Sequence, residues 1–142
     1  MQALLLTNEY PPNVYGGAGV HVEYLARELA KLIDVAVRSF GDQDESHERL
    51  RVRGFQPAHE LGGAPETLRP VLGAFSRNLG AVGEPVMADV AHVHTWYSHL
   101  GGILAKLAYG IPLVLTTHSL EPLRPWKREQ LGGGYDVSAW VE

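Results

Sequence analysis

The sequence contains no cysteine, which excludes a disulfide framework and a thiolate metal site. Only 20% of its residues are charged, the net charge is −4, and lysine and arginine nowhere form a cluster of five, so the charge pattern of a nucleic-acid-binding protein is missing. The longest apolar runs have about six residues, far fewer than the roughly 20 that cross a bilayer. The first residues, MQALLLTNEYPP, have neither the basic start nor the cleavage site of a signal peptide. We therefore expect a soluble, cytoplasmic protein of 142 residues, the size of one domain, that binds neither nucleic acid nor membrane.

Short apolar runs alternate along the chain with segments of helical periodicity. The apolar runs predict strands at 2–7, 34–40, 50–55, 89–94 and 112–117, of which the first and the last are expected to be buried. Apolar residues three and four apart predict helices from Val20, from Pro65 and over 100–109, and a last helix entered through a Ser138 cap. The charged stretch 42–64 is interpreted as a solvated excursion. Strands that alternate with helices predict an α/β fold, a Rossmann-like parallel sheet with helices on both faces.

Three polar segments, 8–19, 94–99 and 118–134, follow predicted strands. They should meet at one rim, because the ligands of an open parallel sheet bind beyond the carboxyl ends of its strands. The first segment contains Gly16 and Gly17, where the backbone and the unpaired N–H groups of the following helix could approach a phosphate. The alternative is that these glycines only form a tight turn. No Walker motif is present, and the glycines do not fit the nicotinamide-binding fingerprint.

Four histidines lie in or near the last two predicted strands. His92 and His94 are two residues apart and point to the same face, and with His118 (and His99 possible nearby) they could bind a metal ion. No carboxylate or thiolate accompanies them, and a mid-strand histidine such as His92 is more often a hydrogen-bonded core residue, so we expect no metal. His94 and His118 come at or just after strand ends, where a neutral imidazole can hydrogen-bond a sugar hydroxyl. Each could instead be structural.

The segment 118–134 is long enough to indicate a function. Its candidate substrate contacts are Glu121, Arg124 and Trp126. Trp126 offers a flat face on which a sugar ring could stack, and the basic residues around it could hold a phosphate. The alternative is that Trp126 packs against the core.

Three segments, taken together, resemble glycosyltransferase family 4. They are EYPPNVYGGAGVHV at 9–22, HVHTWYSHLGG at 92–102 and LTTHSLEPLRPWKREQLGGGY at 115–135. Within the family they are most similar to the bacterial glycogen synthases and α-maltose-1-phosphate synthases. The resemblance implies a GT-B fold, in which two Rossmann-like domains face each other across a cleft. It implies that residues 1–142 are the N-terminal, acceptor-side domain, incomplete at its C-terminal end, and that the second, nucleotide-binding domain is absent.

The resemblance also implies roles for single residues. His118 is similar to the family histidine that contacts the transferred sugar and the reaction centre, which makes it the candidate catalytic residue. Gly16 and Gly17 would lie under the donor diphosphate or the acceptor.

A second matching segment departs from the family pattern. His94, Thr95 and Trp96 match a segment that usually reads His-Asp-Trp, so they are candidate substrate contacts, but the aspartate is Thr95 here. Val14 stands where many ADP-glucose-using synthases have a lysine. Both departures bear on the choice of donor and acceptor.

The function that the resemblance implies is that of a hexosyltransferase in glycogen or maltose-1-phosphate synthesis. Such an enzyme moves glucose from ADP- or UDP-glucose to an α-glucan or to glucose-1-phosphate, with retention of configuration and without a cofactor. The Arg/Lys pair and the Glu-rich motif that grip the nucleotide in the family have no match here, so the chain alone should be inactive. Two alternatives remain, a stand-alone sugar- or phosphate-binding module and a histidine-based metal-binding domain.

Overall fold

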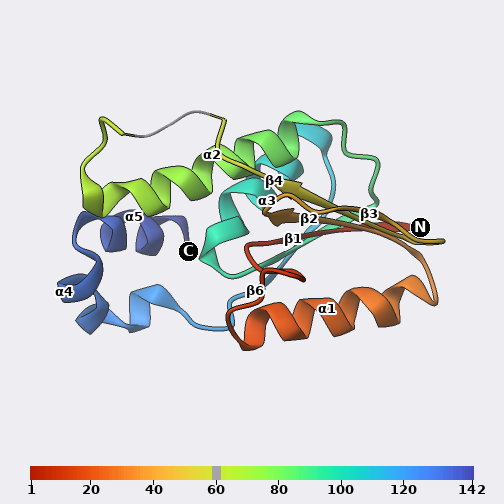
Figure 1. Ribbon diagram of the computed structural model, residues 1–142, viewed down its shortest axis with the longest axis horizontal. Coiled ribbons are helices and arrows are strands. Elements are labelled where there is room, and N and C mark those ends of the chain that lie inside the picture. Colours follow the sequence, from red (N-terminus) through yellow and green to blue (C-terminus); the bar gives the residue numbers. More distant parts are fainter. Residues whose placement is uncertain (59–61) are drawn as a thin grey trace.

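A computed structural model describes residues 1–58 and 62–142 of the chain (Figure 1). The strands are β1 (Gln2–Thr7), β2 (Asp34–Phe40), β3 (Asp44–Ser46), β4 (Leu50–Phe55), β5 (Val90–His94) and β6 (Leu113–Thr116). The α-helices are α1 (Gly17–Ala30), α2 (Arg69–Gly83), α3 (Trp96–Tyr109), α4 (Arg128–Leu131) and α5 (Gly133–Val141). Single 3₁₀ turns are η1 (Glu66–Leu68), η2 (Glu121–Leu123) and η3 (Pro125–Lys127).

Within the described residues the six strands form one sheet in the order β3-β4-β2-β1-β5-β6, and only β3 is antiparallel to its neighbour. The central strand is β1, whose Leu5 pairs with Val37 of β2 and with His92 of β5. Because both faces of a central parallel strand are covered, an uninterrupted apolar sequence is expected there. Residues 3–7 are accordingly all buried, which confirms the prediction for the first strand.

Helices cover both faces of the sheet, with α1 on one side and α2 and α3 on the other (Figure 1). The α1 residues Val22 and Ala26 share a buried cluster with Leu5. On the opposite face, Ala81 of α2 and Ala105 of α3 belong to a second buried cluster. This arrangement confirms the predicted α/β fold with a mostly parallel sheet. None of the helices in the described part of the chain has the length and hydrophobicity to span a bilayer.

Helix α3 approaches both the sheet and α2 closely, because two of its positions lack a side chain. A methyl group at Gly102 would lie 2.4 Å from Cγ1 of Val93, and one at Gly101 would lie 2.4 Å from Oδ1 of Asn78. The buried Asn78 amide donates to the carbonyl of Tyr97 (2.6 Å) and accepts from the N–H of Gly101 (3.0 Å). These contacts fix α3, and with it the end of β5, against the rest of the domain.

Strand β6 and helix α3 differ from the predictions. The last strand was expected to be buried, but Val114 and Leu115 are 46% and 48% exposed, because β6 pairs on one side only among the described strands. The helix expected from residue 100 begins at Trp96 and ends, as predicted, before Gly110, which has φ +68°. The segment 94–99 is therefore mostly helix and not loop.

The C-terminal region was also predicted incorrectly. Ser138 is no helix cap, because it lies inside α5 and its Oγ donates to the carbonyl of Tyr135 (3.0 Å). The segment 118–134, expected to be a loop, contains η2, η3 and α4. Two smaller differences are the turn η1, which precedes the helix expected from Pro65, and the polar strand β3, which no apolar pattern indicates.

Candidate active site

Two histidines meet where β5 and β6 end. In the parallel ladder His94 of β5 pairs with Thr116 of β6, and His118 comes two residues after Thr116. The Nδ1 atom of His94 lies 3.1 Å from Nε2 of His118, a hydrogen-bond distance. His92, one pleat earlier on β5, bonds instead to Oγ1 of Thr116 through its Nε2 (2.8 Å). The expectation that His92 is a hydrogen-bonded strand residue agrees with this geometry.

A third histidine, His21, comes from α1. Its ring centroid lies 5.5 Å from that of His94 and 5.1 Å from that of His118. One ring nitrogen of each of the three residues lies within 4.8 Å of the other two. His94 is buried, whereas His21 and His118 are exposed. We call His21, His94 and His118 the histidine cluster.

Two imidazoles of the cluster, those of His94 and His118, have lowered pKa values, which favour the neutral form. Burial, together with the neighbouring His92, His118, His21 and His99, lowers the pKa of His94 to about 3. The pKa of His118 is also lowered, by burial first and by His21 second, while Glu9 acts in the opposite direction. Neutral imidazoles can both donate and accept hydrogen bonds, which suits the recognition of sugar hydroxyls.

The glycine segment is held by Glu9. Its carboxylate accepts hydrogen bonds from the backbone N–H groups of Tyr15 (2.9 Å) and Gly16 (2.8 Å). Gly16 and Gly17 are exposed, and a methyl group at Gly17 would meet nothing within 4 Å. The N-cap residue Gly16 offers no side-chain bond to the first turn of α1, and no acidic residue lies in that turn, but the Glu9 carboxylate already lies beside this positive helix end.

Both residues that follow β5 and β6 at the site have strained backbone. Thr95 has φ +67° and His118 has φ +51°, and they are the non-glycine residues with positive φ in the described chain. Such conformations cost about 1–3 kcal/mol each and are concentrated at functional sites. The hydroxyl of Thr95 donates to Oδ1 of Asn8 (2.8 Å), which links the ends of β5 and β1.

Trp96 is placed in the core and not on the rim. It is 8% exposed, belongs to a cluster with Val71 and Ala74, and stacks on Tyr97 with 3.9 Å between ring centroids. A direct substrate contact from its ring is therefore not supported by the geometry.

The three candidates of the segment 118–134 are not brought to the histidine cluster. Glu121 is 2% exposed, its carbonyl accepts from the Tyr135 hydroxyl (2.9 Å), and its carboxylate lies 3.4 Å from the Arg124 guanidinium. These contacts lie beside α5, in the part of the chain that folds under α2 in Figure 1. Trp126 is 61% exposed, so the alternative that it packs against the core is wrong.

His99, considered as a possible neighbour of the rim, lies inside α3 and is fully buried. Neither ring nitrogen has a hydrogen-bond partner among the described residues. Burial lowers the pKa of His99 to about 4. It therefore belongs to the packing of α3 and not to the site.

A hollow of about 540 Å³ lies at the same edge of the sheet, on the α2 side. Asn8, Asn13, Tyr15, Arg77 and Tyr97 are among its lining residues. The guanidinium of Arg77 lies over the Phe40 ring (5.2 Å) and makes no ion pair within residues 1–58 and 62–142. Asn8 bonds to Thr95, so this hollow adjoins the end of β5.

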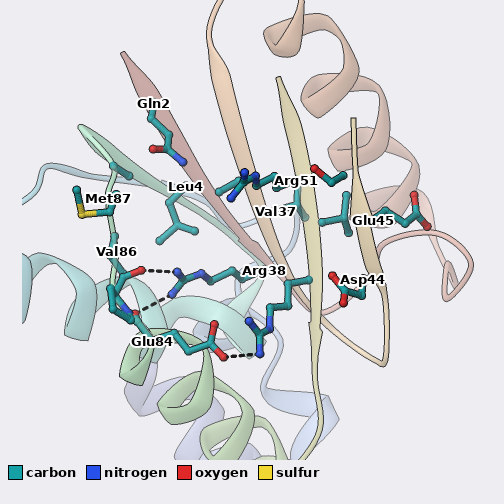
Figure 2. Close-up of a pocket in the computed structure, with 16 residues that line it drawn as sticks. Gln2, Leu4, Val37, Arg38, Asp44, Glu45, Arg51, Glu84, Val86 and Met87 are labelled. Carbon is teal, nitrogen blue, oxygen red and sulfur yellow. Dashed lines mark hydrogen bonds and ion pairs between the residues drawn. The ribbon is translucent and has the colours of Figure 1, made fainter. Parts of the chain in front are cut away.

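Another hollow, of about 520 Å³, lies toward the opposite ends of the strands (Figure 2). Two of its arginines are already engaged, since Arg38 donates to the carbonyls of Ala81, Glu84 and Pro85, and Arg53 pairs with the Glu84 carboxylate at 2.8 Å. These side chains tie β2 and β4 to the segment after α2, which is a structural role.

The fold is a Rossmann-like domain, and its candidate site lies at the carboxyl edge of the sheet. Residues 15–141 match the family Glycosyltransferase Family 4, and the chain belongs to this family. It is 49% identical, over its whole length, to the alpha-maltose-1-phosphate synthase of Mycolicibacterium smegmatis, of which it covers 34%. Identity to a glycogen synthase of Mycobacterium tuberculosis is 30%, over 85% of this chain and 34% of that protein.

The structural comparison agrees with the sequence comparison. A sucrose-phosphate synthase from Thermosynechococcus elongatus superposes with a TM-score of 0.64 at 15% identity, over 97% of this chain and 39% of that one. The expected fold, that of the N-terminal domain of a GT-B glycosyltransferase, is thus confirmed. The chain spans about a third of the length of the alpha-maltose-1-phosphate synthases that it matches.

Sequence reasoning missed His21, Glu9, Asn8 and Arg77. Asn8 and Glu9 could have been found, because both directly follow β1 and therefore lie at the same edge. Arg77 lies in the middle of α2, where an exposed arginine is usual, and no sequence pattern distinguishes it.

Proposed function

We propose that this domain forms the acceptor-side wall of a retaining glycosyltransferase that moves glucose from ADP- or UDP-glucose to glucose-1-phosphate or an α-glucan. The single observation that carries the proposal is the pair of neutral imidazoles of His94 and His118, 3.1 Å apart at the carboxyl edge. Glucose-1-phosphate is the favoured acceptor, because identity is 49% to an alpha-maltose-1-phosphate synthase and 30% to a glycogen synthase.

In this proposal His118 is the catalytic residue. Its exposed imidazole hydrogen-bonds the glucose unit that is being transferred, while His94 acts as a positioning residue through the Nδ1–Nε2 contact. The glucose ring gains positive charge as the bond to the diphosphate breaks. A neutral imidazole stabilises the polar transition state without repelling that charge, and the lowered pKa of His118 keeps it neutral at pH 7.

In this proposal a phosphate group and the body of the acceptor bind at different places along the carboxyl edge of the sheet. The exposed backbone of Gly16 and Gly17, at the start of α1, would approach a phosphate of the donor or acceptor. The hollow lined by Asn8, Tyr15 and Arg77 would hold the acceptor, with the Arg77 guanidinium near its phosphate. The remaining candidate contacts, Glu121, Arg124 and Trp126, would act only indirectly in this arrangement.

The proposal is tested in a chimera in which residues 1–142 replace the matching third of the Mycolicibacterium smegmatis synthase. Transfer from ADP- or UDP-glucose to glucose-1-phosphate is expected in the chimera and not in the 142-residue chain alone, which lacks the groups that stabilise the leaving diphosphate. His118→Ala should lower kcat about 100-fold or more.

Two controls separate chemistry from folding. His118→Asn removes the imidazole but tolerates positive φ, so it should lose activity with less effect on the melting temperature than His118→Ala. His47→Ala changes a histidine whose side chain is 66% exposed and paired with Glu45, and it should leave kcat unchanged. Wild-type kcat in the His118→Ala chimera would contradict the proposed site.

A further inference from the structure

The histidine cluster has the composition and spacing of a metal site. Tetrahedral Zn²⁺ binds imidazole nitrogen at about 2.0–2.1 Å, which separates two ligand nitrogens by about 3.3 Å. The nitrogens of His94 and His118 are already 3.1 Å apart. The largest separation among the three ligand atoms is within 4.8 Å, so closing the cluster on an ion requires a movement of at most about 1.5 Å.

That movement is available to His21. It is exposed on the first turns of α1, so its side chain can change rotamer without disturbing the core. His94 is fixed by burial and by its position at the end of β5, and His118 is exposed beside it. An ion can therefore reach the cluster from solvent and find one fixed ligand and two accessible ones.

We propose that His21, His94 and His118 bind a divalent transition-metal ion, for which Zn²⁺ is the best match. An all-imidazole set favours Zn²⁺, Cu²⁺ and Ni²⁺ over the oxygen-seeking Mg²⁺ and Ca²⁺. Three protein ligands leave the fourth tetrahedral position for water or a substrate oxygen. His92 is not a ligand, because its Nε2 bonds to Thr116 and its place in the set is taken by His21.

Metal binding has a consequence that rests on the proposed function. In the proposed function Nε2 of His118 stays on Nδ1 of His94, and this contact aims the His118 imidazole at the transferred glucose, whereas a metal ion shared by the two residues replaces that contact and turns the ring. Zn²⁺ should therefore inhibit transfer by withdrawing His118, and the site would work as an inhibitory metal site beside the reaction centre.

The site is tested by isothermal titration of the untagged 142-residue chain with Zn²⁺, and with Mg²⁺ for comparison. We expect one Zn²⁺ per chain and no Mg²⁺ binding. His21→Ala and His118→Ala should each weaken Zn²⁺ binding by more than the roughly 10- to 100-fold that loss of an outer-shell partner costs. His47→Ala, at an exposed histidine outside the cluster, should bind like the parent.

Circular dichroism shows whether each variant is folded, and imidazole ¹H–¹⁵N spectra of the unsubstituted chain give a second readout. Zn²⁺ should shift the nitrogen resonances of His21, His94 and His118 and leave those of His47 in place. A folded chain that binds no Zn²⁺, or that binds it equally after His21→Ala and His118→Ala, would overturn the metal site.

The link to transfer is tested separately in the chimera. Zn²⁺ should lower its activity, and His21→Ala, which leaves His118 in place, should relieve that inhibition. Zn²⁺ that binds to the cluster without inhibiting an active chimera would overturn the placement of His118 at the reaction centre and leave the metal site standing. An inactive chimera whose cluster binds Zn²⁺ would likewise count against the proposed function alone.

Discussion

Replacing His99 by glutamine should make the domain less sensitive to mild acid. His99 is fully buried in α3, and neither of its ring nitrogens has a hydrogen-bond partner among the described residues. Protonation would place a buried charge where no hydrogen-bond acceptor meets it, which is why burial lowers the pKa of His99 to about 4. Glutamine has a similar length and cannot take up a proton.

The size of the effect follows from the two pKa values. In the unfolded chain an imidazole has a pKa of about 6.5. Below that pH the unfolded chain gains a proton that the native state does not accept, so the contribution of neutral His99 is complete above pH 6.5 and is lost as the pH falls toward 4. At about 1.4 kcal/mol for each unit of difference the complete loss is about 3 kcal/mol, of which about 2 kcal/mol is reached by pH 5.

The assay is urea unfolding followed by circular dichroism at about pH 7.5 and about pH 5. The loss of unfolding free energy between the two pH values should be about 2 kcal/mol smaller in His99→Gln than in the parent. The absolute stability of the variant does not matter, because only the difference between the two pH values is compared. His47→Gln, at a side chain that is 66% exposed, should behave like the parent. The reasoning is refuted if His99→Gln loses as much stability over this interval as the parent does.

Three further substitutions, with Gly17→Ala as a control, test the packing of α3 and the hollow that contains Arg77. Asn78→Ala removes the amide that bonds to the N–H of Gly101, and it should lower the unfolding free energy by about 2–4 kcal/mol in urea unfolding, because buried partners are left unpaired. Gly102→Ala should cost about 1–3 kcal/mol by overpacking, whereas Gly17→Ala, where a methyl group meets nothing within 4 Å, should not destabilise the fold. In the chimera, Arg77→Gln should raise KM for glucose-1-phosphate more than for an α-glucan, and equal effects on both acceptors would contradict a phosphate contact.

Apolar patterns in the sequence predicted the strands and helices whose residues are buried along a continuous run. They did not predict elements that form because of contacts with distant parts of the chain, against the helix or strand propensity of their own residues. The run at 2–7 gives β1 because a strand covered on both faces has only apolar positions to fill. Helix α5 begins with Gly133 and Gly134, although glycine costs about 1 kcal/mol relative to alanine inside a helix. Its formation depends on the burial of Tyr135 and Val141, which no local pattern reveals.

The candidate site was predictable to the extent that topology alone determines it. Parallel strands end at one edge, so His94 and His118 could be expected to approach each other once β5 and β6 were identified. His21 lies in a helix, at a position that the sequence does not distinguish from an ordinary polar one. Only the packing of α1 against the sheet brings it close to His94 and His118. The burial of Glu121 could not be predicted either, because its neighbours in sequence give no sign that the Tyr135 hydroxyl reaches its carbonyl.

The rigidity of the edge explains how strained residues can persist there. The N–H of Thr95 bonds to the carbonyl of Thr116 (3.0 Å) and its hydroxyl to Asn8 (2.8 Å), so the neighbouring strands hold this residue at φ +67°. Strain of about 1–3 kcal/mol is sustained only where the surroundings over-determine the conformation, and a ladder of parallel strands provides that. The edge thus fixes His94, whereas His21 stands on an exposed helical turn where its rotamer can change. One fixed imidazole beside two accessible ones can adapt to ligands of different size, which both the proposed glucose contact and the proposed metal site require.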